Sequence, residues 1–213
     1  MNAGRVWKSS WLVSIITVIL FIGCKTEVKE LPYYGSFGED KQKEFTVPKF
    51  SFINQDSTET SHKDYEGSIY VTDFFFTTCP SICPIMSSQM SRLQDMLKAE
   101  EVWGEVKLLS HTVNPENDSP AILKAYAERI GADLSNWNFV TGDQETLYDQ
   151  AKTGYFMTAL ESDTAAGGFF HSDNFVLIDQ NKHIRGYYDG TSTQSVNQLL
   201  EDIKLLVKTK NDE

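Results

Sequence analysis

An apolar stretch that leads into two closely spaced cysteines constrains the fold more than any other feature of the chain. Residues 67–76 read GSIYVTDFFF, a nearly continuous β-branched and aromatic run that is typical of a buried central strand. Residues 83–100 then place apolar side chains at helical spacing. Cys79 and Cys83, within TTCPSICPIM, therefore stand where a central strand becomes a helix.

The rest of the chain alternates strand and helix patterns from residue 45 onwards. We expect a strand or hairpin at 45–54, a buried strand at 105–113, a helix at 119–131, a strand at 137–142, a helix at 143–152, a loop at 161–168, a hairpin at 174–190 and a closing helix at 192–208. This order predicts an α/β fold of the thioredoxin-like type, with a central mixed sheet and helices on both faces.

The first residues show the pattern of a targeting signal. Arg5 and Lys8 precede an apolar stretch that ends in LFIGC at Cys24. We predict a lipoprotein-type signal peptide over residues 1–23 and lipid attachment to Cys24, and an uncleaved single-span anchor is the alternative. Both interpretations hold the protein at the bacterial cell envelope, on the periplasmic or extracytoplasmic face of a membrane.

A polar segment separates that signal from the folded part. Residues 24–44 contain two glycines and show no apolar periodicity, so we predict a flexible tether with a reach of about 25 Å. The thioredoxin-like domain is predicted over residues 45–210.

The spacing of the two cysteines leaves their chemistry open. Residues four apart on a helix lie on one face, and the partial positive charge at a helix N-terminus favours the thiolate. Such a pair can form a disulfide, serve as a redox pair, or supply two sulfur ligands to a metal ion. A structural disulfide would close a very short loop and stabilise little, so redox chemistry and metal binding are the main alternatives.

A later histidine favours metal binding. Thioredoxin-type oxidoreductases use C-x-x-C with a proline late in the domain, but here three residues separate the cysteines and the last proline is Pro120. His171, in GGFFHSDNFVLID, precedes the strand where that proline would be expected. Two thiolates and an imidazole suit Cu(I), whereas Zn²⁺ usually takes a fourth ligand.

The other titratable candidates receive structural interpretations. We interpret His62, His111 and His183 as structural or solvated residues. Asp73 lies inside the apolar strand, where a carboxylate needs a partner. Asp73 either influences the chemistry of the cysteines or is a core acid whose carboxylate has its hydrogen-bond partners, and we favour the second interpretation.

The negative charge of the chain indicates which classes of partner it can bind. Nineteen basic and 30 acidic residues give a formal net charge of −11. Nucleic-acid binding requires a basic face, so we exclude that class. Metal cations and basic protein partners stay compatible with this charge.

Four segments together are similar to one known family. DFFFTTCPSICPIM, TVNPENDSPAILKAYAERIG, WNFVTG and FFHSDNFVLID, in this order, resemble the SCO/SenC family over residues 45–207. The resemblance implies a membrane-tethered thioredoxin-like domain that binds copper through Cys79, Cys83 and His171. It also implies a role in assembling the binuclear copper centre of cytochrome c oxidase subunit II.

Two departures from the family pattern each remove a negative charge. The residues between the cysteines are Pro80, Ser81 and Ile82, where many members have an aspartate, and Asn114 replaces the aspartate of the usual V-D-P segment. Both changes bear on partner docking and copper affinity, and neither removes a ligand.

Two main functions follow from these observations. The first is a metallochaperone that carries one copper ion per domain to cytochrome c oxidase subunit II or a related copper protein. The alternative is a thiol–disulfide reductase, and thus an enzyme, in which Cys79 and Cys83 form the redox pair that keeps the oxidase's copper-binding cysteines reduced. A peroxiredoxin-like or redox-sensing role is a weaker third hypothesis.

Overall fold

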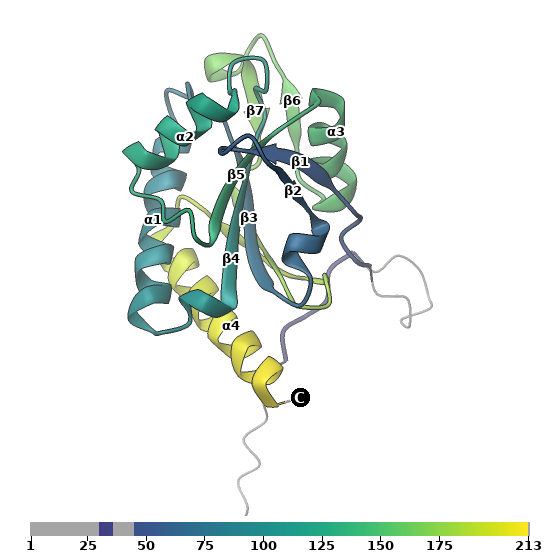
Figure 1. Ribbon diagram of the computed structural model, residues 1–213, viewed down its shortest axis with the longest axis vertical. Helices are drawn as coiled ribbons and strands as arrows, with labels where there is room; N and C mark the ends of the chain where they lie inside the picture. Colours follow the sequence, from purple (N-terminus) through teal and green to yellow (C-terminus); the bar gives the residue numbers. More distant parts are fainter. Residues whose placement is uncertain (1–29, 36–44, 213) are drawn as a thin grey trace, which may run out of the picture. The chain divides into compact units, whose positions relative to one another are not determined.

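The computed structural model describes residues 30–35 and 45–212, and seven of the strands in this part of the chain form one mixed sheet (Figure 1). The strand order in this sheet is β2-β1-β5-β4-β3-β8-β9. The strands are β1 (Ser51–Asn54), β2 (Glu59–Ser61), β3 (Ile69–Phe75), β4 (Val106–Thr112), β5 (Trp137–Thr141), β8 (Asn174–Ile178) and β9 (Ile184–Asp189). β3, β4 and β5 run parallel, and the other neighbouring pairs are antiparallel.

A second, two-stranded sheet lies outside the main one. It pairs β6 (Ala159–Glu161) with β7 (Phe169–His171) in antiparallel register. The turn between these strands contains Gly167 and Gly168, both with positive φ. We call residues 159–171 the β6–β7 hairpin.

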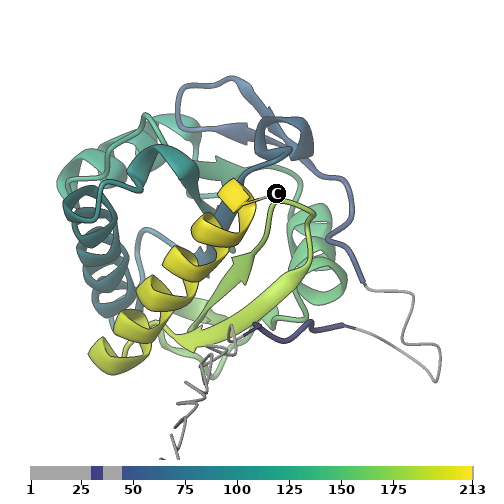
Figure 2. The same ribbon diagram turned by 90° about the horizontal axis from the view of Figure 1, so that it is seen from below.

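Helices cover both faces of the main sheet. The helices are α1 (Cys83–Ala99), α2 (Pro120–Arg129), α3 (Gln144–Asp149) and α4 (Thr193–Asp212), and short helical turns occur at 62–65, 103–105, 150–154 and 166–168. Figure 2 shows α1 and α4 on one side of the sheet and α3 on the other. This arrangement confirms the predicted thioredoxin-like α/β fold.

The strand and the helix that flank the cysteines form the centre of the core. All seven residues of β3 are buried, because β4 and β8 pair with its edges and helices cover its faces. α1 buries Met86, Met90, Leu93 and Leu97, which recur every three or four residues and therefore share one face. This packing holds the start of α1 directly beyond the end of β3.

Two elements in the second half of the domain differ from the sequence expectations. The helix predicted at 143–152 divides into α3 and a π-helical turn at Gln150–Gly154. The loop predicted at 161–168 joins the strands of the β6–β7 hairpin, so His171 lies on its own short strand rather than in the loop before β8. Periodicity over three residues is too short to reveal a strand.

Part of the range predicted as a tether contacts the domain. Leu31 is buried, the N–H of Tyr34 donates to the carbonyl oxygen of Ile184, and Arg185 donates to the carbonyl oxygens of Leu31 and Pro32. The predicted signal peptide and Cys24 lie outside the described residues. Within residues 30–35 and 45–212, no helix has both the length and the apolar character needed to cross a membrane.

Candidate metal centre

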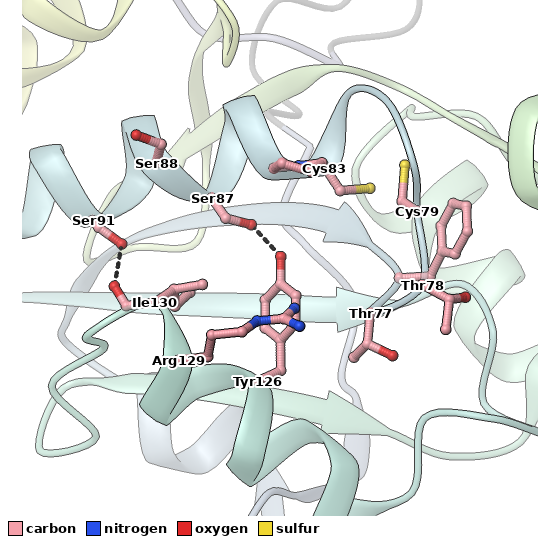
Figure 3. A pocket seen from close by; sticks show the side chains of 12 residues that line it. Thr77, Thr78, Cys79, Cys83, Ser87, Ser88, Ser91, Tyr126, Arg129 and Ile130 are labelled. Atoms are coloured by element: carbon pink, nitrogen blue, oxygen red, sulfur yellow. Dashed lines mark hydrogen bonds between the residues drawn. The ribbon is translucent and has the colours of Figure 1, made fainter.

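The turn that carries Cys79 is fixed at both ends. β3 ends at Phe75, and the N–H of Cys79 donates to the carbonyl oxygen of Phe76 at 3.2 Å. Four residues later α1 begins at Cys83, with Pro84 in its first turn, where a missing N–H costs nothing. Figure 3 shows the two sulfur atoms near each other at the start of α1.

The structure brings Cys79, Cys83 and His171 together. One ligand atom from each residue lies within 4.8 Å of the others, and Sγ of Cys83 is 3.1 Å from Nε2 of His171. Both cysteines are free thiols. The exposed fraction is 9% for Cys79, 1% for Cys83 and 9% for His171, so the cluster is shielded from bulk water.

A backbone hydrogen bond fixes the orientation of the imidazole. Nδ1 of His171 donates to the carbonyl oxygen of Ser172 at 3.0 Å, which leaves the lone pair of Nε2 directed at the sulfur atoms. The ring of Phe76 meets this imidazole edge-on at 5.9 Å. Burial lowers the pKa of His171, and the ring is therefore held in the neutral form that a metal ion requires.

The two thiols have opposite acidities. Partial burial opposes ionisation of Cys79, but hydrogen bonds from the N–H groups of Ser81 and Cys83 and from their side chains lower its pKa overall. Burial raises the pKa of Cys83 well above its usual range, and its hydrogen bond to Cys79 adds to the rise. Cys79 is therefore the thiol of the pair that ionises more readily, and Cys83 holds its proton more strongly.

Residues 76–82, between β3 and α1, form what we call the cysteine turn. Asp118 fixes the start of this turn, and it was not identified from the sequence. Its buried carboxylate accepts hydrogen bonds from the N–H and Oγ1 of Thr77, from Oγ1 of Thr112 and from Nδ2 of Asn117. The sequence signal is an acidic residue just before the N-terminus of α2. That pattern equally marks a solvent-exposed helix start, so it did not point to the site.

The β6–β7 hairpin packs on the cysteine turn. A Cβ added at Gly167 would lie 2.8 Å from the ring of Phe76 and 3.2 Å from Pro80. The ring of Phe169 also packs against Phe76, at 5.2 Å between centroids. These contacts set the distance between the hairpin, which ends in His171, and the two sulfurs.

Asp73 is a buried acid with a hydrogen-bond partner. It accepts from Oγ of Ser110 at 2.6 Å, and that oxygen accepts from Nε1 of Trp137. Burial raises the pKa of Asp73 to about 7. This environment agrees with the interpretation of Asp73 as a core acid.

The three other histidines lie outside the cluster. His111 is fully buried, stacks on Phe74 and shares a hydrogen bond with Thr72. Nδ1 of His183 is 3.3 Å from a carboxylate oxygen of Asp179, and Nδ1 of His62 is 3.3 Å from the carbonyl oxygen of Phe50. Each of the three histidines therefore contacts groups of the fold and none contacts the cysteine cluster.

Two cavities reach the centre from different sides. The cysteine cavity, of about 540 Å³, lies between α1 and α2 and is lined by Cys79 and Cys83 (Figure 3). The histidine cavity, of about 430 Å³, is lined by Cys79, His171 and Asp173. Cys79 borders both, so a partner can approach it from either side.

The donor set selects a soft metal ion. Two sulfur atoms and one imidazole nitrogen converge in a buried cluster that contains no carboxylate oxygen. Such a set of three suits Cu(I), whereas Mg²⁺ and Ca²⁺ require oxygen ligands and structural Zn²⁺ requires a fourth donor. The same two thiols can also pass electrons as a dithiol and disulfide pair.

Comparison with known proteins supports the resemblance to the SCO/SenC family. The sequence pattern of the SCO1/SenC family matches residues 38–208. A solved structure of a SCO1/SenC family lipoprotein from Bacillus anthracis is 34% identical, with a TM-score of 0.71, over 76% of this chain and 95% of that chain.

Two further relatives cover most of the chain. One is a solved structure of a member of the Sco family of cytochrome c oxidase assembly proteins in which a disulfide switch was identified. It is 28% identical, with a TM-score of 0.70, over 84% of this chain and 96% of that chain. A putative copper-binding protein from Stutzerimonas stutzeri is 30% identical over 147 residues, which are 68% of this chain and 70% of that protein. Because the family pattern extends over far more than half of the sequence, this chain belongs to the SCO1/SenC family.

Proposed function

We propose that this protein binds one copper ion through Sγ of Cys79, Sγ of Cys83 and Nε2 of His171, and delivers it during assembly of the binuclear copper centre of cytochrome c oxidase subunit II. The observation that carries the proposal is the convergence of these three soft ligand atoms within 4.8 Å in a buried site. The family membership and the copper-binding relative support the choice of metal.

Each ligand has a distinct part in loading. Cys79 is the thiol that loses its proton more readily and it borders both cavities, so it makes the first contact with incoming Cu(I). Cys83 must lose its proton before it can bind, and metal binding therefore releases that proton. His171 needs no proton transfer, because its Nε2 lone pair is free while Nδ1 donates to the backbone.

We also propose that the domain works at the outer face of a membrane. The LFIGC sequence provides a lipid-attachment site at Cys24, with residues 1–23 as the signal and a tether before residue 45. The Bacillus anthracis relative is a lipoprotein. Within the range predicted as a tether, Leu31 and Tyr34 hydrogen-bond with β9.

A metal titration tests the ligand assignment. The reduced full chain should bind one equivalent of Cu(I), and Cys79→Ser, Cys83→Ser and His171→Ala should each weaken binding by at least about tenfold. His62→Ala is the matched control, because His62 is outside the cluster, and it should bind like the wild type. Unchanged affinity in His171→Ala would rule out the proposed set.

The unequal thiols support a second candidate function. A thiol at Cys79 that ionises more readily than its neighbour Cys83 is the arrangement that thiol–disulfide exchange uses, and one relative has a disulfide switch. As a reductase the protein would keep the oxidase's copper-binding cysteines reduced. Exchange with an oxidised target peptide should then persist in His171→Ala, and a rate no greater than that of Cys79→Ser would dismiss this function.

A further inference from the structure

The cysteine cavity offers more than access to the sulfur atoms. Its wall on α1 carries Ser87 and Ser91, and its wall on α2 carries Tyr126 and Arg129 (Figure 3). Ser87 hydrogen-bonds with the hydroxyl of Tyr126, and Ser91 donates to the carbonyl oxygen of Ile130 at 3.0 Å. These bonds join the two helices and give the cavity a fixed polar floor.

Arg129 places a positive charge on this cavity. Its guanidinium lies over the ring of Tyr126, 4.8 Å from the ring centroid. Among the residues that the structure describes, it has no ion pair with a carboxylate, whereas Lys124 on the same helix pairs with Asp56 at 2.8 Å. No acidic residue lines the cavity. Arg129 is exposed and lines the same cavity as the two thiols, so in a chain with a formal net charge of −11 it offers a positive charge to an anionic ligand there.

The histidine cavity has the opposite character. It is lined by the carboxylate of Asp173 and by Phe170, and no lysine or arginine borders it. The two routes to Cys79 therefore favour ligands of different charge. An anionic ligand will approach through the cysteine cavity.

We propose that the cysteine cavity binds a thiol or disulfide that carries a carboxylate, with the carboxylate on Arg129 and the sulfur at Cys79. A volume of about 540 Å³ is within the range of small-molecule sites and admits a tripeptide-sized compound. A guanidinium is the side chain best suited to bind a carboxylate through two hydrogen bonds. The inference rests on the second candidate function, thiol–disulfide exchange, and not on copper binding.

The exchange is balanced without a further reactant. The thiolate of Cys79 attacks one sulfur of the disulfide RSSR, the S–S bond breaks, and the first RS⁻ leaves and takes up a proton. The sulfur of Cys83 then loses its proton and attacks Cys79 in the mixed disulfide, which releases the second RSH. The protein gives up two electrons and RSSR gains two. The reverse reaction reduces the protein with two RSH.

The test compares disulfides that differ in charge. The reduced full chain would be oxidised by oxidised glutathione, which bears carboxylates, and by bis(2-hydroxyethyl) disulfide, which is uncharged, with loss of free thiol as the readout. Arg129→Gln should slow the reaction with oxidised glutathione by roughly three- to tenfold, the size of one exposed charge-assisted contact, and leave the uncharged disulfide unaffected. Arg129→Lys should recover part of the difference.

Controls separate this site from general electrostatics and from copper binding. Lys124→Gln removes the same charge from the same helix outside the cavity, and it should leave both rates unchanged. Copper affinity of Arg129→Gln should equal that of the wild type, so failure of the copper proposal and failure of this one are distinguishable. A disulfide-linked cysteine peptide with a neighbouring Asp or Asn shows whether a protein segment can be the source of the carboxylate.

Two results would overturn the proposal. The first is an Arg129→Gln variant that slows charged and uncharged disulfides equally, and the second is a variant that slows neither. Selectivity for the carboxylate in the glutathione arm, the peptide arm or both supports it.

Discussion

The two sides of the metal centre are built differently. The cysteines lie between a fully buried strand and a 17-residue helix, and Asp118 ties their turn to β4 and to the start of α2. His171 ends a hairpin whose two strands of three residues pair only with each other and expose Leu160 and Phe170 by 44% and 57%. The sulfur geometry is therefore a property of the core, whereas the position of the imidazole depends on a few contacts at the surface.

The difference has a functional consequence. A site that must bind a metal ion and later release it needs one ligand that can move at low cost, and weakly packed elements open most readily. We expect the hairpin to be that element, because its turn at Gly167 and the ring of Phe169 pack on the surface of the cysteine turn rather than in the core.

The largest effect on the free energy of unfolding is expected from the ionisation of Asp73, in the strand that leads to the cysteines. Burial raises the pKa of this carboxyl from 3.8 to about 7, so the stabilisation from its protonated form is complete below about pH 4 and is lost as the pH rises through 7. Asp73→Asn should therefore be more stable than the wild type at pH 8, by up to about 4 kcal/mol in free energy of unfolding. Denaturant unfolding at pH 4 and pH 8 measures it, and a stability difference that does not grow with pH would contradict it.

A smaller effect is expected from removing the carboxylate of Asp118. Asp118→Ala leaves the N–H and Oγ1 of Thr77 and Oγ1 of Thr112 without their acceptor, and should cost about 3 kcal/mol of unfolding free energy. Asp118→Asn keeps one acceptor oxygen and should lose less. Chemical denaturation gives the two values, and equal losses in the two variants would show that hydrogen bonding by the carboxylate is not the cause.

The smallest effect on stability, with a specific effect on copper, is expected at the hairpin. Gly167→Ala should cost about 1–2 kcal/mol because φ is +82°, and the new methyl group would also push the hairpin away from Phe76 and Pro80. We expect weaker Cu(I) binding as a result.

Gly168→Ala is the matched control for the hairpin. Its φ is +87°, but its Cβ would meet no atom within 4 Å. It should lose similar stability and keep its copper affinity. Equal copper affinities in the two variants would mean that the contact of Gly167 does not position His171.

Local sequence was sufficient for several features. The apolar run at 67–76 and the helical spacing after Cys83 predicted β3 and α1, because a strand buried on both faces and a helix buried on one have different apolar periods. The segments around Cys79, Cys83 and His171 also indicated the family, which the comparisons confirm. Short elements were missed, since the three-residue strands β6 and β7 carry no measurable period.

By itself, the sequence determined the fold class, the family and the placing of both sulfur atoms at one strand-to-helix turn, because each is read from local patterns and from their order along the chain. The tertiary structure alone decided which nitrogen of His171 faces the sulfurs, that Asp118 holds their turn, and that Arg129 lines their cavity with no carboxylate partner among the described residues. These features join residues from separate elements. Their distances depend on how the helices and the hairpin pack, which no local pattern of side chains specifies.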